Sequence, residues 1–123
     1  KAAPPSVVFT GNRSDAMNLM ASHNIFVLPS LRDASPRVLR EAQACGLPCI
    51  VSDIPGARDL IVAGQSGFLV APGSAEAIAE AVRKFASDSA LTKEMGKKAK
   101  RNIAENFAPE AFTEYYINLF NSL

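Results

Sequence analysis

The chain has 123 residues, of which 48% are hydrophobic and 20% are charged, and its formal net charge is +1. This balance is typical of one soluble globular domain with a sizeable core, and the length is short for a complete two-lobed enzyme. A net charge near zero gives no reason to expect nucleic acid as a partner, and no apolar run approaches the ~20 residues of a membrane span. We therefore predict a single domain over residues 1–123.

The two cysteines, Cys45 and Cys49, have no histidine or further cysteine at metal-ligand spacing. We interpret both as small buried thiols in a reducing compartment, rather than as a bridge or a metal site. Residues 1–6 lack the apolar core of a signal peptide, which favours a cytoplasmic location. These observations predict a protein with no metal and no cofactor.

Short apolar runs alternate with helical patterns along the chain. In chain order, the expected strands are residues 7–9, 25–28, 49–51 and 68–70. The expected helices follow Ser14, begin at Pro36, span residues 57–63, 75–86 and 89–106, and begin again at Pro109. Such alternation is typical of a mostly parallel sheet that is covered on both faces. We predict an α/β fold with a parallel sheet of about four strands and helices on both faces.

The segment between the second and third strands carries the most informative pattern. Ser35 can cap a short helix, Pro36 suits the first helical position, and Gly46 can end the helix. Two acids, Asp33 and Glu41, bracket the helix start with seven residues between them. Parallel sheets bind ligands beyond the carboxyl ends of their strands, and helix N-termini attract anions. We expect the loops after residues 9, 28 and 51 to gather around a ligand at that edge.

This segment resembles the donor-binding half of the family-four (group 1) retaining glycosyltransferases, which have the GT-B fold. The family pattern stands here as Pro29-Ser30, then Asp33, then Glu41-Ala42, and then Gly46-Leu47-Pro48. Segments 55–59 and 64–70 also resemble the family, so that the match spans roughly residue 7 to the C-terminus. One departure concerns the first acid, which is Asp33 in place of the usual glutamate.

The resemblance implies a partial Rossmann-like C-terminal domain that binds a nucleoside-diphosphate sugar. A helix N-terminus suits the diphosphate, and a carboxylate suits a pair of vicinal hydroxyls. The implied site residues are Asp33 for the transferred sugar, Ser35, Arg37 and Val38 for the diphosphate, Glu41 for the ribose, and Gly11, Asn12 and Arg13 for the base. By resemblance, a hexose-type sugar is transferred with retention of its anomeric configuration, without a metal ion in this half.

The resemblance also implies that parts of the family's protein are absent. In the family, two strand–helix units precede the first strand seen here, and an acceptor-binding domain precedes those units. We therefore expect an N-terminally truncated fragment that does not turn over substrate alone. Its expected partners are the nucleotide-sugar donor, the missing acceptor domain, and a second copy docked through the first strand or the last helix.

Other readings stay open. Asp33 and Glu41 are also compatible with ordinary solvated acids that stabilise a helix start. A non-catalytic nucleotide-binding or protein-interaction module would share the same α/β architecture. A signalling receiver would need an acidic cluster after the first strand, and residues 10–12 offer none. Lys93, Lys97, Lys100 and Arg101 recur on one helical face, either as a solvated face or as a contact with the inner membrane surface.

Overall fold

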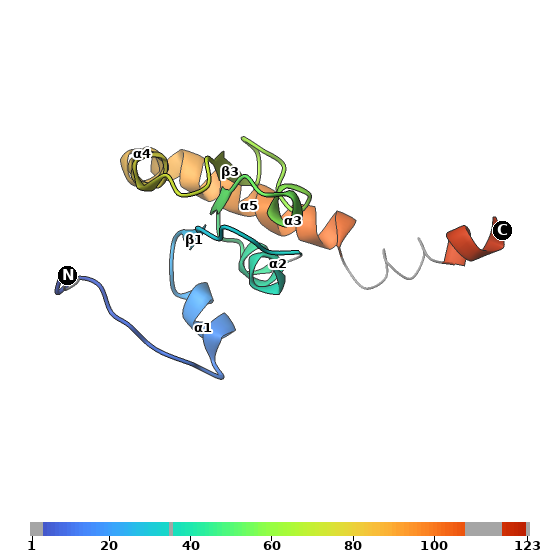
Figure 1. Cartoon of the computed structure of the whole chain (residues 1–123), viewed down its shortest axis with the longest axis horizontal. Helices are drawn as coiled ribbons and strands as arrows, with labels where there is room; N and C mark the ends of the chain where they lie inside the picture. The colour runs from blue at the N-terminus through green and yellow to red at the C-terminus, as the bar shows by residue number, and fades with distance from the viewer. Residues whose placement is uncertain (1–3, 35, 108–116, 123) are drawn as a thin grey trace.

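The computed structural model describes residues 4–34, 36–107 and 117–122 (Figure 1). Its elements in chain order are α1 (Ala16–Ala21), β1 (Phe26–Leu28), α2 (Arg37–Ala44), β2 (Cys49–Ser52), α3 (Pro55–Arg58), β3 (Gly67–Val70), α4 (Ala75–Ser87) and α5 (Ser89–Asn106). The strands form one parallel sheet in the order β1-β2-β3. The predicted α/β class with a parallel sheet is confirmed, but the described sheet has three strands where about four were expected.

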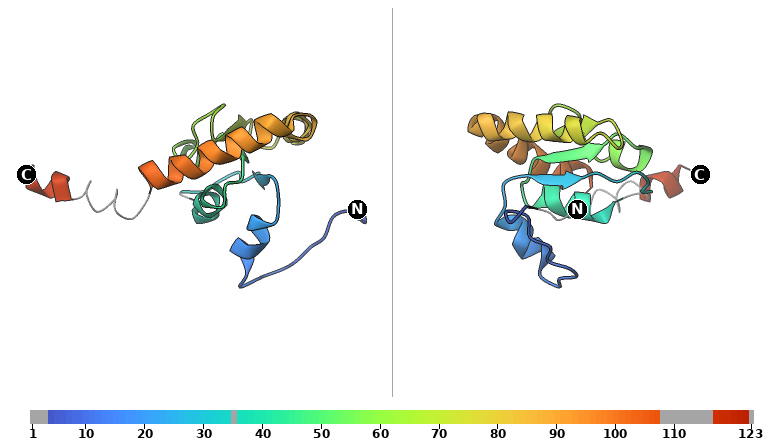
Figure 2. Two further views of the ribbon diagram at one scale, coloured as in Figure 1. Left: turned by 180° about the vertical axis from the view of Figure 1, so that it is seen from behind. Right: turned by 60° about the vertical axis from the view of Figure 1, so that its left-hand side comes forward.

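The central strand β2 separates two hydrophobic layers, because successive side chains of a strand point to opposite faces. Cys49 and Val51 pack with Leu39 of α2 and Ala57 of α3. Ile50 faces the other way and packs with residues of α4 and α5. Figure 2 shows this arrangement, with the sheet between α2 on one side and α4 on the other. Helices therefore cover both faces, as the all-apolar composition of β2 predicts.

The two long helices begin where side-chain caps are available. The Ser74 hydroxyl accepts a hydrogen bond of 3.1 Å from the N–H of Ala77, and the Asp88 carboxylate accepts one of 3.0 Å from the N–H of Leu91. Each cap satisfies one of the N–H groups that a first helical turn leaves unpaired. The prediction for α5 over residues 89–106 is confirmed at both ends, and α4 ends one residue beyond its prediction. Within the described residues, no helix is long and apolar enough to cross a membrane.

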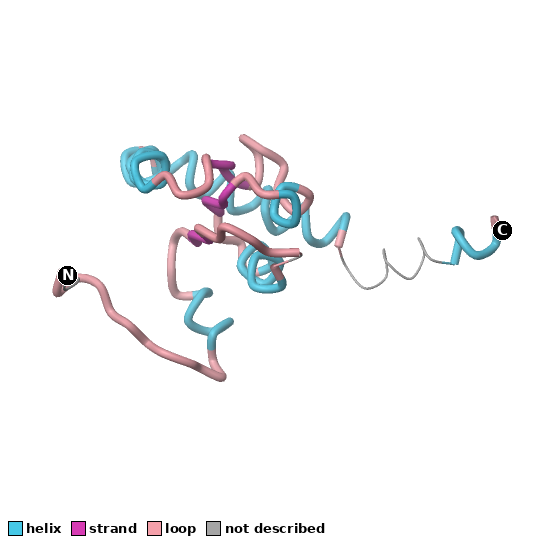
Figure 3. The backbone as a smooth tube through the Cα atoms, viewed as in Figure 1, coloured by secondary structure: helices cyan, strands magenta, loops and turns pink. Residues whose placement is uncertain are grey.

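The prediction of a buried strand at residues 7–9 is wrong. Val7, Val8 and Phe9 lie in an extended segment that pairs with none of the described strands, and they are 49%, 77% and 83% exposed. Figure 3 shows this segment as a loop that runs clear of the sheet. An apolar run becomes a strand only when a neighbouring strand supplies hydrogen-bond partners. A dimer contact through this segment stays a prediction.

Two other segments differ from the expected elements. The helix predicted at residues 57–63 is the shorter α3, which ends at Arg58. Beyond the end of α3, the N–H of Leu60 donates to the Ala57 carbonyl at 3.0 Å, and the Leu60 carbonyl accepts side-chain hydrogen bonds from Gln43 and Asn102. The predicted start of the last helix at Pro109 lies outside the described residues. Residues 117–121 are helical and carry the exposed side chains Ile117, Leu119 and Phe120.

Burial of the Cys49 thiol generates a prediction about alkaline pH. Both cysteines are free; Cys45 is half-buried, whereas Cys49 is buried and its burial raises the pKa of the thiol to about 12. The unfolded chain releases that proton at about pH 8.5, so the folded state holds one more proton above that pH. The free energy of unfolding should therefore fall by about 1.4 kcal/mol per pH unit from about pH 9 upward because of this thiol.

The measurement is urea unfolding of the reduced chain at several alkaline pH values, compared with Cys49→Ala. The variant should be less stable at neutral pH, because it leaves a cavity. Its stability should nevertheless decline less steeply above pH 9 than that of the unaltered chain. Parallel declines would contradict the assignment of the alkaline limb to Cys49.

Candidate functional site

The carboxyl ends of β1, β2 and β3 meet at one edge of the sheet because the strands are parallel. The loop after β1 leads into α2, and the turn after β2 leads into α3. Asp53, in that turn, donates its backbone N–H to the carbonyl of Val70 at 2.8 Å, which ties the ends of β2 and β3 together. Of the three loops predicted to gather here, those after β1 and β2 do so.

The start of α2 faces this edge without a side-chain cap in the described structure. Pro36 is the N-cap residue and makes no side-chain cap hydrogen bond. The N–H of Leu39 donates to the Pro36 carbonyl at 3.1 Å, whereas Arg37 and Val38 stand in the first turn, where N–H groups have no intrahelical acceptor. Arg37, not Pro36, is thus the first helical residue. Ser35 lies outside the described residues, and its predicted roles stay predictions.

Arg37 and Glu41 lie on the same side of α2, one turn apart. The Arg37 Nε is 3.2 Å from Glu41 Oε1, and the two side chains are 86% and 28% exposed. An exposed pair at this spacing contributes only about 0.3–0.5 kcal/mol, because water screens it. The two side chains predicted to bind the diphosphate and the ribose therefore hold each other weakly. The structure places Val38 half-buried beside them.

Asp33 lies in a shallow depression where the loop after β1 meets the turn after β2. Its lining residues are Leu31, Arg32, Asp33, Ala34, Ile54, Pro55 and Gly56. A Cβ atom at Gly56 would overlap the backbone carbonyl oxygens of Asp33 and Ala34. Only glycine permits this approach, and the approach brings the Asp33 loop onto the start of α3. The sequence analysis did not predict this contact between Gly56 and the Asp33 loop, although Pro55-Gly56 indicated a turn at this point after β2.

A second feature missed by the sequence reading is the ion pair that brackets this turn. Arg58 Nε donates to Asp53 Oδ1 at 2.6 Å, and the hydrogen bond and charge of Asp53 raise the pKa of Arg58. Both side chains are about half exposed, which limits the energy of the pair. The pair closes the turn that holds Gly56 against the Asp33 loop. The sequence carried one indication of this pair, because Asp53 and Arg58 lie five residues apart on either side of Pro55-Gly56.

The segment predicted to contact a base lies elsewhere. Arg13 pairs with Asp15 through two hydrogen bonds of 2.7 and 2.6 Å, and this contact lowers the pKa of the Asp15 carboxyl. Gly11 has a positive φ of 66°, which makes the corner before α1. Figures 1 and 2 show this corner well apart from the loop after β1 in every view. The structure does not bring Gly11, Asn12 and Arg13 to the edge, and their role stays a prediction.

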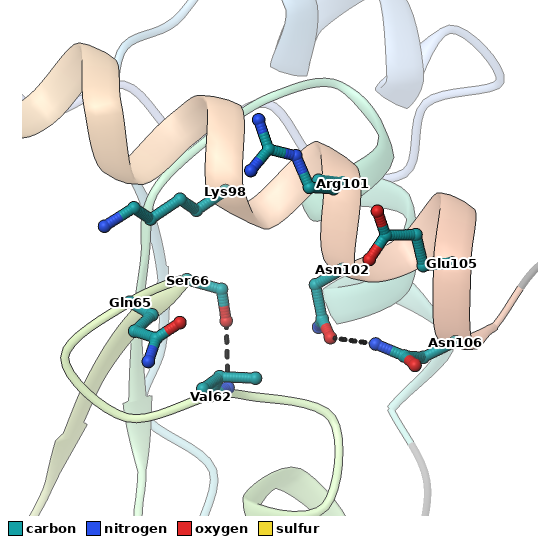
Figure 4. A pocket seen from close by; sticks show the side chains of 8 residues that line it. All are labelled: Val62, Gln65, Ser66, Lys98, Arg101, Asn102, Glu105 and Asn106. Carbon is teal, nitrogen blue, oxygen red and sulfur yellow. Dashed lines mark hydrogen bonds between the residues drawn. The ribbon is translucent and has the colours of Figure 1, made fainter.

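A further cavity lies at the opposite edge of the sheet, before the start of β3 (Figure 4). It is lined by Val62, Gln65, Ser66, Lys98, Arg101, Asn102, Glu105 and Asn106. None of the sequence-predicted site residues lines it. In the described part of the chain, no group of three histidine, cysteine or acidic side chains could hold a metal ion.

Comparisons with known proteins agree on one family. The family described as "Glycosyl transferases group 1" matches residues 2–102. The chain is 31% identical over 118 residues to the capsular polysaccharide biosynthesis glycosyltransferase CapM of Staphylococcus aureus, covering 96% of this chain and 31% of CapM. It is 34% identical over 101 residues to the Escherichia coli UDP-Gal:alpha-D-GlcNAc-diphosphoundecaprenol alpha-1,3-galactosyltransferase, covering 82% of this chain and 26% of that enzyme.

The structural comparison gives the same result. HepE from Anabaena, solved in complex with UDP, superimposes with a TM-score of 0.84 at 26% identity. The match covers 90% of this chain and 31% of HepE. The chain thus spans about a third or less of the length of these similar proteins.

Replacing Gly56 by alanine tests the contact between the two loops. The added Cβ would collide with backbone atoms, so the Asp33 loop or the start of α3 must shift. We expect Gly56→Ala to lower the free energy of unfolding by about 1–3 kcal/mol and to move the amide resonances of Asp33 and Ala34. The control is Gly11→Ala, which also loses stability because alanine is strained at a φ of 66°. Its new Cβ meets open space, so the resonances of Asp33 and Ala34 should not move. Unchanged resonances at Asp33 in Gly56→Ala would contradict the contact.

Proposed function

Because this chain belongs to the glycosyl transferases group 1 family, we propose that it forms the donor-binding part of a glycosyltransferase that uses a nucleoside-diphosphate sugar. The observation that carries the proposal is the carboxyl edge of the sheet. There, the first turn of α2, Glu41 and the Asp33 depression lie within one continuous loop and helix. UDP bound to HepE supports a uridine nucleotide as the first ligand to test.

The diphosphate would lie at the start of α2. The N–H groups of Arg37 and Val38 and the positive end of the helix dipole attract an anion. The Arg37 guanidinium is almost fully exposed, so it can turn from Glu41 toward a phosphate at little cost. Positive charge at this point would stabilise the leaving diphosphate as the bond to the sugar breaks.

The two acids would take the sugars on either side of the diphosphate. Glu41, released from Arg37, can accept hydrogen bonds from two ribose hydroxyls. Asp33, in the depression beside Gly56, can accept hydroxyls of the transferred sugar. We propose retention of anomeric configuration on the family resemblance alone. Since the chain spans about a third of the length of CapM and HepE, we also propose that it binds donor but does not transfer sugar by itself.

Titration with UDP, followed by amide resonances of the chain, tests this assignment. We expect shifts at Arg37, Val38 and Glu41 with UDP, and additional shifts at Asp33 with UDP-glucose. Glu41→Gln should weaken UDP binding about tenfold, because hydrogen bonds to a charged acceptor contribute about 1.5–3 kcal/mol. The matched control is Arg83→Gln, an exposed change on α4, which packs on the other face of the sheet.

Absence of any shift at millimolar UDP, in a folded sample, would refute nucleotide binding by this chain. Shifts confined to residues outside α2 would refute the placement of the diphosphate. A chimera in which this chain replaces the matching part of HepE then tests catalysis. Turnover or hydrolysis of UDP-glucose supports a transferase, whereas binding without turnover supports the non-catalytic module.

We also propose that the basic face of α5 contacts an anionic membrane surface. Lys93, Lys97, Lys100 and Arg101 are all exposed and fall on one side of the helix, within about 100° of arc. The diphosphoundecaprenol-linked substrate in the name of the Escherichia coli relative is a membrane lipid, which supports this choice of partner. A continuous basic face next to anionic lipid gains about 1 kcal/mol per cation.

The prediction is that the chain sediments with vesicles containing phosphatidylglycerol and not with neutral vesicles. Lys97→Gln combined with Lys100→Gln should weaken this binding by about 2 kcal/mol, roughly thirtyfold. The matched control, Arg83→Gln combined with Lys84→Gln, removes two charges from α4. Equal losses in the two double variants would show a response to net charge and would contradict a specific face.

A further inference from the structure

A buried network of side-chain amides joins α2, α5 and the turn after α3. Gln43 is fully buried, and Asn102 is 7% exposed. The Asn102 Nδ2 donates to Gln43 Oε1 at 2.9 Å and to the Leu60 carbonyl at 3.0 Å, while Gln43 Nε2 donates to the same carbonyl at 3.0 Å. Asn106 adds an outer bond of 3.0 Å to Asn102 Oδ1, which Figure 4 shows as a dashed line.

These contacts differ in kind from the apolar packing around them. Leu39 and Ala42 also hold α2 in the core, but apolar contacts tolerate small rotations because they are not directional. Buried amides are costly without partners, and hydrogen bonds weaken steeply away from linear geometry. The triangle of Gln43, Asn102 and the Leu60 carbonyl therefore allows one rotational setting of α2.

The opposite side of α2 presents the proposed ligand groups. At about 100° per residue, Glu41 lies about 200° around the helix from Gln43, and Arg37 shares the side of Glu41. Side-chain tips stand about 5–6 Å from a helix axis, so a rotation of about 20° would move the Glu41 carboxylate by about 2 Å. A hydrogen bond to a ribose hydroxyl would not survive that displacement.

The start of α2 offers no comparable anchor in the described structure. Its N-cap residue, Pro36, makes no side-chain hydrogen bond to the first turn, and the Arg37–Glu41 pair lies within the helix itself. With only eight residues, α2 turns as one short rigid body. The hydrogen bonds between Gln43, Asn102 and the Leu60 carbonyl therefore give α2 a directional anchor near its C-terminal end.

We propose that Gln43 and Asn102 are positioning residues that set the rotation of α2, and thereby the placement of Glu41 and Arg37 against a nucleoside diphosphate. This assignment rests on the proposed function, because the nucleotide is the ligand whose contacts it aligns. It links α5 to the donor edge through one buried contact between residues 59 positions apart in sequence.

The test measures UDP affinity and stability separately in the full chain. Asn102→Leu and Gln43→Leu, similar in size but unable to hydrogen-bond, should each weaken UDP binding about tenfold. The double variant should bind no worse than either single variant, because one network is lost in all three. The exchange Gln43→Asn with Asn102→Gln keeps the amide groups and should recover affinity relative to the Leu variants.

Two controls separate positioning from loss of stability. Phe85→Leu destabilises the core on the other face of the sheet, and its folded fraction should keep the UDP affinity of the unaltered chain. Asn106→Leu removes only the outer bond and should change affinity less than Asn102→Leu. Affinity that is unchanged in folded Asn102→Leu overturns the positioning role alone. Failure of the unaltered chain to bind UDP overturns the proposed function and the positioning role together.

Discussion

The close approach of Gly56 to the backbone of Asp33 and Ala34 is the contact on which the candidate site depends. The two loops leave neighbouring strands, β1 and β2, and would diverge if a side chain stood between them. The Asp53–Arg58 pair and the bond from Asp53 to Val70 hold the second loop in place. The depression that contains Asp33 is therefore fixed from the β2 side, by a turn that contains none of the predicted site residues.

Local patterns predicted much of this fold, and their failures share one cause. The bounds of α5 and the start of α4 follow from caps and periodicity, which are properties of contiguous residues. The apolar run at residues 7–9 has the composition of a strand, but a strand also needs a neighbour that no local pattern encodes. The segment after α3 also has partners that no local pattern shows, since distant Gln43 and Asn102 donate to the Leu60 carbonyl.

The candidate site also combines features that local spacing predicts with features that depend on contacts between remote segments. Arg37 and Glu41 could be placed on one side of α2 from their spacing alone, because four residues make about one helical turn. The meeting of Asp33 with Gly56 and the anchoring of Gln43 by Asn102 depend on contacts between remote segments. Sequence reading therefore identified groups that carry charge and missed the groups that fix their geometry. The predicted base contact at Gly11 meets the same limit of local patterns. Gly11 could reach the carboxyl edge of the sheet only if residues 7–9 were paired in that sheet as a strand.

The Arg37–Glu41 pair explains how a site with opposite charges on one helix can accept an anion. In the absence of ligand, Arg37 and Glu41 form an ion pair with each other. Because this pair is exposed and weak, a ligand can replace either partner at little cost. A diphosphate would take the guanidinium while ribose hydroxyls take the carboxylate, so the number of charge-assisted contacts rises. The net gain then comes from the first-turn N–H groups of α2, which have no intrahelical acceptor in either state. In the role proposed for Gln43 and Asn102, the buried amides on the far side of α2 hold the Glu41 carboxylate where the ribose hydroxyls reach it.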